Sequence, residues 1–275
     1  MNESKRIMIR RMAGFTLVEA VLVIVITGIL TGMVAVFIVK PVQGYIDTVR
    51  RADLTDAADT ALKRIARDVR TALPNSLRAA NPAGNCFEFL PTVGGGRYRA
   101  AQSSAGAGDI LDFSTADTSF DVLASDNLTA AMFAGTFHAV VYNLGIAGAD
   151  AYDAANLNRA QIRSTSTVAN IVLNAANQFP YKSPSRRFHV IPDFSVAYSC
   201  SGGNLFRQTQ AISSAQIACP TTGTVLVGNV DCTQTTFNYT PAVSQRNGLL
   251  TITLVLTQSG ESVRLYDEVH VNNAP

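Results

Sequence analysis

The chain begins with a short basic stretch followed by a long run of apolar residues. From Phe15 to Val39 there are 25 residues, and Glu19 is the single ionisable side chain among them. A helix of this length would measure about 37 Å at ~1.5 Å per residue, which exceeds a hydrocarbon core of about 30 Å. The pattern therefore predicts a membrane-spanning helix over residues 15–39.

Basic residues before the apolar run set its expected orientation. They are Lys5, Arg6, Arg10 and Arg11, and they stand against Glu3 alone. Positively charged flanks stay on the cytoplasmic side of a membrane, so the N-terminus is expected in the cytoplasm. Everything after Lys40 is then exported, and the protein crosses the membrane once.

Beyond Pro41 apolar residues recur at helical spacing. The apolar stripe consists of Leu54, Ala58, Ala61, Leu62, Ile65, Val69, Ala72 and Leu73. Pro74 is expected to end this amphipathic helix because the residue before a proline is pushed out of the α region. We expect the membrane helix to continue into this stalk, residues 40–74, with a kink or short break near Pro41 and Gly44.

The opposite face of the stalk is charged. Its residues are Arg50, Arg51, Asp53, Asp56, Asp59, Lys63, Arg64, Arg67, Asp68 and Arg70. Pairs four residues apart, such as Asp59 and Lys63, are typical of a solvated helix face. A contact surface between subunits is the alternative interpretation.

From residue 75 to 275 short β-like runs alternate with Gly, Pro, Asn and Ser, which predicts a β-rich head. The expected strands are Cys86–Leu90, Ile110–Phe113, Thr136–Asn143, Phe188–Ile191, Phe194–Ser199, Leu205–Gln208, Phe237–Tyr239, Leu249–Thr257 and Ser262–Val271. Short turns predict two hairpins, one joining 194–199 to 205–208 and one joining 249–257 to 262–271.

The expected fold class is α+β, a long N-terminal helix packed on an antiparallel sheet. Such a sheet needs a cover for its apolar face, and the stripe of the stalk helix can supply it. Residues 100–178 are rich in Ala, Ser, Asn and Gly. We expect them to form a long insertion with loops and a minor sheet.

Charge and composition argue against some classes of function. The net charge is +2, and the first 13 residues carry an excess of three positive charges, so the rest of the chain sums to −1. A nucleic-acid partner is not expected, because phosphate-binding proteins carry a clear basic surplus. An apolar content of 47% also argues against a disordered or collagen-like chain.

All four cysteines lie in the exported head. An even number in an oxidising compartment, without a C-x-x-C spacing, predicts two disulfides rather than a metal site. Three pairings are possible. The preferred one joins Cys219 to Cys232 across a loop rich in Thr, Gly and Pro, and joins Cys86 to Cys200 as a staple between the start of the head and its sheet.

No catalytic motif is present in the sequence. His138, His189 and His270 alternate with apolar residues and are expected on strand faces. The run Gly94–Gly96 precedes Arg97 and lacks the Gly-Lys-Ser/Thr of a phosphate cradle, so it predicts a turn. Arg186, Arg187 and His189 could form a basic contact patch, although a solvated strand end is preferred. We expect no enzymatic activity, no catalytic residue, no cofactor and no metal.

The junction of leader and apolar run has an unusual sequence, R-R-M-A-G-F-T-L-V-E over residues 10–19. An ordinary secretory signal has a shorter apolar run with a small-residue cut after it, and Val36–Pro41 offers none. The junction resembles the prepilin signal of type IV pilins and type II secretion pseudopilins. The resemblance implies a cytoplasmic leader over residues 1–14, cleavage between Gly14 and Phe15 by a prepilin peptidase, and N-methylation of Phe15.

Glu19 matches the glutamate that this family has at the fifth mature position. A carboxylate in a membrane helix costs about 2.5–3.5 kcal/mol, so it is kept where it has a partner. The resemblance implies a salt bridge to the amino terminus of a neighbouring subunit; a tolerated polar residue facing lipid headgroups is the alternative. Gly28 and Gly32 form a small-xxx-small face suited to close helix packing.

Patches along the rest of the chain resemble minor pilins of the MSHA pilus. They are Pro41–Tyr45, Ala66–Arg78, Arg187–Ile191, Val196–Cys200, Asn204–Arg207 and Asp267–Pro275. The J-type minor pseudopilins of type II secretion are similar too, with a Tyr strand, a turn and a Leu-x-Arg strand. The resemblance implies the bacterial inner membrane, then the filament or its tip, and as partners the peptidase, other major and minor pilins, and the inner-membrane assembly platform. A third interpretation of the protein's function is a membrane-anchored adhesin or enzyme that never polymerises.

Overall fold

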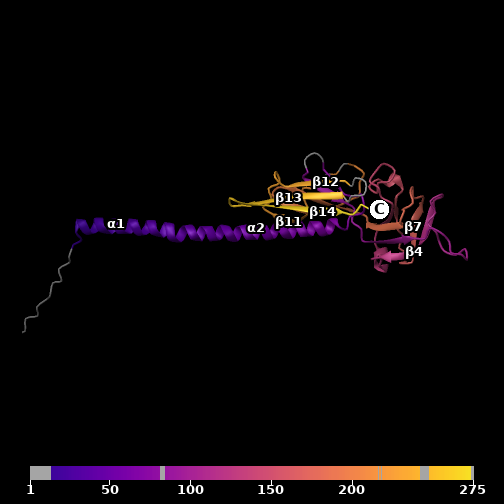
Figure 1. Cartoon of the computed structure of the whole chain (residues 1–275), viewed down its shortest axis with the longest axis horizontal. Coiled ribbons are helices and arrows are strands. Elements are labelled where there is room, and N and C mark those ends of the chain that lie inside the picture. Colours follow the sequence, from indigo (N-terminus) through magenta and orange to yellow (C-terminus); the bar gives the residue numbers. More distant parts are fainter. Residues whose placement is uncertain (1–13, 81–83, 216, 218, 242–247, 274–275) are drawn as a thin grey trace, which may run out of the picture. The chain divides into compact units, whose positions relative to one another are not determined.

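The structure is a computed structural model that describes residues 14–80, 84–215, 217, 219–241 and 248–273. The chain divides into two compact units, Met1–Ala52 and Asp53–Pro275 (Figure 1). The first unit is helical from Leu17 onward. The second contains the end of the long helix and all the described strands.

The apolar run is helical from Leu17 onward, with one irregular turn. Helix α1 (Leu17–Val34) passes through a π-helical turn, η1 (Ala35–Val39), into helix α2 (Lys40–Val69). The irregularity therefore lies just before Pro41, and Gly44 lies in regular helix. A proline lacks an N–H and its ring clashes with the carbonyl four residues earlier, and the wider π-turn accommodates both.

Helix α2 ends earlier than the position of Pro74 predicts. Its last residue is Val69, and a turn follows. Ala72 then forms a bridge with Pro91, and the Leu73 N–H donates to the Leu90 carbonyl at 2.7 Å. Residues 72 and 73 thus leave the helix because they pair with an extended segment. The whole predicted apolar stripe is buried, Ala72 and Leu73 included.

The strands form three antiparallel sheets. The five-stranded sheet has the order β1 (Arg78–Ala79), β2 (Cys86–Phe89), β9 (Ser195–Ser201), β10 (Asn204–Gln210), β11 (Thr224–Gly228). The three-stranded sheet has the order β12 (Thr236–Thr240), β13 (Gly248–Gln258), β14 (Glu261–Val271). The six-stranded sheet has the order β6 (Arg159–Gln161), β5 (Phe137–Val141), β8 (Arg187–Pro192), β3 (Gly94–Tyr98), β4 (Asp117–Asp126), β7 (Asn170–Asn177). Two short 3₁₀ helices, η2 (Ala130–Ala134) and η3 (Ala154–Asn156), lie between strands.

Both predicted hairpins are confirmed. β9 and β10 pair from Ser201↔Asn204 onward, and β13 and β14 pair from Gln258↔Glu261 onward. Both two-residue turns have positive φ at each central residue, as type I′ turns require. The expected strand Ile110–Phe113 is wrong: the Asp112 carboxylate accepts hydrogen bonds from Ser114 and Thr115 and folds this segment into a local turn instead.

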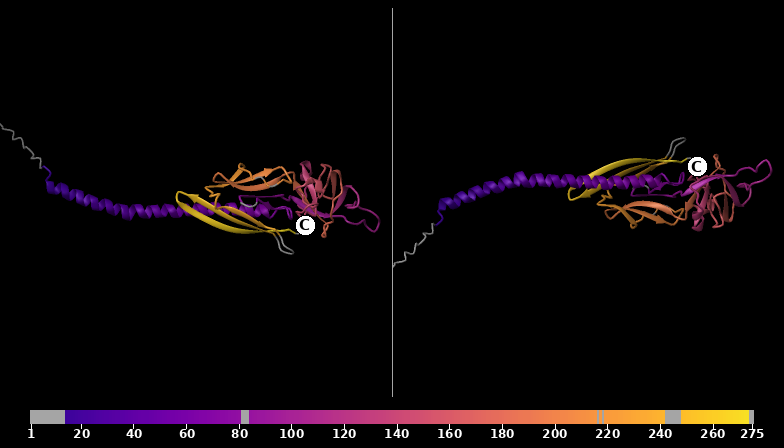
Figure 2. Two further views of the ribbon diagram at one scale, coloured as in Figure 1. Left: turned by 90° about the horizontal axis from the view of Figure 1, so that it is seen from above. Right: turned by 90° about the horizontal axis from the view of Figure 1, so that it is seen from below.

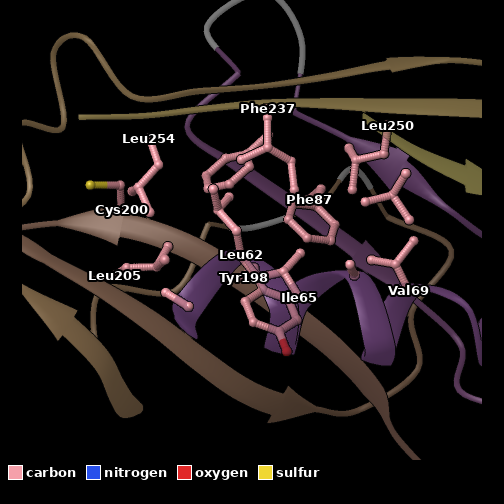
Figure 3. Packing of buried hydrophobic residues seen from close by; sticks show 14 of the residues in the cluster. Leu62, Ile65, Val69, Phe87, Tyr198, Cys200, Leu205, Phe237, Leu250 and Leu254 are labelled. Carbon is pink, nitrogen blue, oxygen red and sulfur yellow. The ribbon is translucent and has the colours of Figure 1, made fainter. Parts of the chain in front are cut away.

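One hydrophobic core joins α2 to two sheets. Leu62, Ile65 and Val69 of the helix meet aromatic residues of the five-stranded sheet, among them Phe87 and Tyr198 (Figure 3). Leucines of β13 belong to the same core, and the β13–β14 hairpin lies on the other side of the helix from β9 and β10 (Figure 2). The α+β fold, with a long N-terminal helix packed on antiparallel sheets, is thereby confirmed.

The expected minor sheet is in fact the largest of the three. Residues 94–192 supply its six strands, and it has a core of its own that includes Phe120, Phe179 and Phe188. The predicted turn at Gly94–Gly96 is wrong as well, because these residues lie in β3, an interior strand. A Cβ on Gly95 would lie 2.5 Å from the Phe188 carbonyl oxygen, so glycine is needed for close strand approach.

Candidate assembly site

The residues around the predicted cleavage site precede the first turn of α1. Gly14, Phe15 and Thr16 are not helical, and Thr16 is the N-cap, whose hydroxyl accepts a hydrogen bond from the Glu19 N–H at 3.3 Å. Thr16 and Glu19 form the T-x-x-E pattern of a capping box, a signal for the helix start that we overlooked in the sequence. The Gly14–Phe15 bond therefore lies outside the helix.

Helix α1 has an exposed, mostly apolar surface with Glu19 as its single ionisable residue. It contains no buried residue, and the side chains of Leu17 and Val18 are 82% and 75% exposed. The hydroxyls of Thr27 and Thr31 donate to carbonyls one turn back, at 2.6 and 2.7 Å. Its polar side chains other than Glu19 are thus satisfied within the helix, as a lipid environment requires. By length and composition the helix can cross a membrane.

The glycines of the apolar helix do not pack against any other described part of the chain. Gly28 and Gly32 lie one turn apart, and a Cβ at either position would meet nothing within 4 Å. Glycine inside a helix costs roughly 1 kcal/mol relative to alanine. Any packing benefit must therefore come from a molecule outside this chain.

Residues 9–35 match the family model described as the prokaryotic N-terminal methylation motif. The N-terminal segment is type IV prepilin-like. This match extends from the basic leader through most of the apolar run, and it supports membrane anchoring and a pilin or pseudopilin role. Residues 1–13 of the leader lie outside the described residues. No curated protein and no solved structure matches the chain.

Later in the chain, the triad of Asp68, Tyr198 and Arg207 attaches α2 to the five-stranded sheet. The Asp68 carboxylate accepts hydrogen bonds from the Tyr198 hydroxyl at 2.7 Å and from Arg207 Nε at 2.8 Å. Tyr198 and Arg207 lie opposite each other on β9 and β10. Burial raises the pKa of Tyr198 above its usual range, and the hydrogen bond to Asp68 raises it further, so the hydroxyl stays a donor. Asp68, assigned from sequence to the solvated face, is thus a contact to the sheet.

A buried charge, that of Glu88, lies in the five-stranded sheet. Glu88 on β2 is 1% exposed and pairs with Arg78, while Ser195 donates to it at 3.3 Å. Gln210 on β10 donates to the same carboxylate. The Arg78 guanidinium lies 3.7 Å from the centre of the Tyr152 ring, which belongs to the small core between the five- and six-stranded sheets. The sequence signal that could have predicted this contact is Glu88 itself, a single glutamate within an otherwise apolar strand.

The cysteines form two disulfides, but the preferred pairing is wrong. The bonds are Cys86–Cys219 and Cys200–Cys232. Cys86 lies opposite Ser199 in the β2–β9 register, and Cys200 is the next residue along β9. Successive side chains of a strand point to opposite faces, so Cys86 and Cys200 cannot meet. Cys200 instead faces the core shared with α2.

The three histidines lie on strands, as predicted. His138 and His189 belong to neighbouring strands β5 and β8, and His270 is exposed on β14. Burial, followed by repulsion from Arg187, lowers the pKa of His189 to about 4, so its ring is neutral at pH 7. Among the described residues no group of three or more His, Cys, Asp or Glu side chains is arranged to hold a metal ion.

Proposed function

We propose that this protein is an MshO-like minor pilin of an MSHA-type type IV pilus. Its role is structural: it enters the filament through its N-terminal helix and contributes to filament assembly and, through the filament, to surface adhesion. The observation that carries the proposal is the methylation motif over residues 9–35 on a helix with no buried side chain. Such a helix needs lipid before assembly and neighbouring subunits afterwards.

Processing is the first step of this function. A prepilin peptidase cuts between Gly14 and Phe15 on the cytoplasmic side of the inner membrane, and Phe15 becomes the methylated N-terminus. The new amino group then lies next to the N-cap Thr16, at the positive end of the helix dipole. The positive charge of this amino group and the positive end of the helix dipole repel each other, so the mature N-terminus favours a nearby carboxylate.

Glu19 supplies that carboxylate. In our proposal it pairs with the Phe15 amino group of a neighbouring subunit as helices stack, and the pairing removes both charges from the apolar interior of the filament. Gly28 and Gly32 allow the close helix approach that such stacking needs. The assembly platform of the inner membrane and the other major and minor pilins are the partners.

The size of the head supports a minor rather than a major subunit. Beyond the two sheets that cover α2, the chain adds a six-stranded sheet with its own core. A head of this bulk packs poorly in a repeating shaft, which favours placement at or near the tip. Immunogold labels spaced evenly along purified filaments would contradict this placement.

The alternative function is that of a J-type minor pseudopilin in a type II secretion system. The observation that favours it is the pairing of Tyr198 on β9 with Arg207 on β10, because the Tyr strand, turn and Leu-x-Arg strand resemble that group. The two functions separate in one experiment. Deletion of the gene removes surface pili if the protein is a pilin, and it blocks release of exoproteins with pili intact if it is a pseudopilin.

The role of Glu19 is tested by Glu19→Gln and Glu19→Ala. Glutamine serves at the third helical position of a capping box as glutamate does, so Glu19→Gln keeps the cap and removes the charge. If the charge pairs between subunits, both variants insert and are processed but enter few filaments. Normal incorporation of Glu19→Gln would show that the residue acts only at the helix start.

A further inference from the structure

A pocket of about 550 Å³ opens on the head where three parts of the fold meet. Arg70 and Thr71 line it from the turn after α2, residues of β3, β4 and β8 line it from the six-stranded sheet, and Asn272 lines it from the segment after β14. The other polar residues that line it include Thr92, Ser125 and Asn127. It is separate from the Asp68 triad and from both disulfides.

The pocket has an excess of positive charge. Arg70, Arg97 and Arg187 line it against one acidic residue, Asp126. Within the described part of the chain, none of these three guanidinium groups has a hydrogen bond or an ion pair. The arginines of the head that stabilise the fold do: Arg78, Arg99 and Arg207 each pair with a carboxylate. The three pocket arginines are therefore free for an external anion.

His189 adds a polar atom without adding charge. It lines the same pocket, and its Nε2 is buried and has no hydrogen-bond partner among the described residues. The ring is neutral at pH 7, so this nitrogen is a hydrogen-bonding group rather than a cation. Arg187 and His189 are close neighbours on one strand, whereas the fold adds Arg70 and Arg97 from distant positions in the sequence.

The pairing of strand β3, which lines the pocket, argues against an extended peptide as the ligand. Gly94, Gly95 and Gly96 of β3 line the pocket, and β3 is an interior strand that pairs with β4 on one side and β8 on the other. An extended peptide gains affinity by adding to a free strand edge, and no such edge exists along β3. The lining also holds the hydroxyl and amide side chains of Thr92, Ser125 and Asn127. Hydroxyl and amide groups can form hydrogen bonds with the hydroxyls of a sugar.

We propose that this pocket binds an acidic saccharide, whose carboxylate or sulfate groups are held by Arg70, Arg97 and Arg187. A planar guanidinium donates two parallel hydrogen bonds to a carboxylate or a sulfate, which is why arginine selects such groups. The threonine, serine and asparagine side chains of the lining bind sugar hydroxyls. The inference does not depend on filament assembly and can be tested on the isolated full-length protein.

The test is calorimetric titration of the full-length protein in non-ionic detergent. The probes are an oligogalacturonate, a sulfated heparin oligosaccharide, a neutral oligoglucan of similar length and a polyglutamate peptide. We expect an acidic saccharide to bind, more weakly as salt rises. Arg97→Gln and Arg187→Gln should each weaken binding by about tenfold, as the loss of a charge-assisted hydrogen bond does. Arg264→Gln, an exposed arginine on β14 outside the pocket, is the matched control and should bind like wild type.

Four results would overturn the proposal. They are binding of neither acidic saccharide, equal binding of the neutral oligoglucan, tighter binding of polyglutamate, and equal weakening by Arg264→Gln. The first three reject the ligand class and the fourth rejects the site. Because Arg97 and Arg187 are exposed, their variants should unfold at the wild-type temperature, which shows that a lost affinity is not a lost fold.

Discussion

Removal of the Asp68 carboxylate should destabilise the head measurably. Asp68→Ala leaves the Tyr198 hydroxyl and the Arg207 guanidinium without the acceptor that they now share at 2.7 and 2.8 Å. A hydrogen bond to a charged group contributes about 1.5–3 kcal/mol. The Asp68 and Arg207 side chains keep 22% and 28% exposure, which weakens both bonds. We therefore expect the free energy of unfolding to fall by about 2–3 kcal/mol in total.

The assay is urea unfolding of the full-length protein in detergent, followed by near-ultraviolet circular dichroism of the head. Asp59→Ala is the matched control, because Asp59 lies on the same helix and its partner Lys63 is 72% exposed. The control should lose much less stability. A double-mutant cycle of Asp68→Ala with Arg207→Ala should give a coupling energy above ~0.5 kcal/mol. If Asp68→Ala and Asp59→Ala lose equal stability, the triad does not attach the helix to the sheet.

Three further predictions concern other parts of the head and the apolar helix. Peptide mapping without reduction should recover fragments linked through Cys86–Cys219 and Cys200–Cys232, and a Cys86–Cys200 fragment would contradict the strand register. The free energy of unfolding should decrease from pH 7 to pH 4. In the unfolded chain His189 has a pKa of about 6.5 and takes up a proton in this range, whereas in the folded protein its pKa is about 4 and it stays neutral. His189→Phe should flatten that part of the stability curve, and an unchanged slope would assign it to other groups. Gly28→Leu should leave membrane insertion intact and reduce filament incorporation; normal incorporation would show that no helix packs closely there.

Local pattern was sufficient for much of the fold. Periodicity predicts the apolar run and the buried stripe of α2, and turn residues that adopt positive φ predict the two hairpins. Each of these signals lies within a short stretch of sequence. The six-stranded sheet was underestimated because its strands break the usual pattern. β3 begins with Gly94–Gly96, and β4 contains several polar residues, so neither resembles a buried strand.

The contacts that involve distant residues could not be derived from the sequence. Asp68 belongs by helical spacing to a charged face, and only the β9–β10 register places Tyr198 and Arg207 over it. The disulfides depend in the same way on which face of β2 and β9 each cysteine occupies. The three pocket arginines are far apart in sequence, and the fold alone brings them together. The capping box at Thr16 and Glu19, in contrast, was readable and was missed.

Prepilin processing is tested most directly by the intact mass of the protein extracted from membranes, with and without the prepilin peptidase of the host. We expect a chain that begins at N-methylated Phe15, and only when the peptidase is present. With the peptidase deleted, the same preparation should begin at Met1. A chain that still begins at Met1 in the presence of an active peptidase would contradict the proposed pilin function and leave a plain membrane anchor.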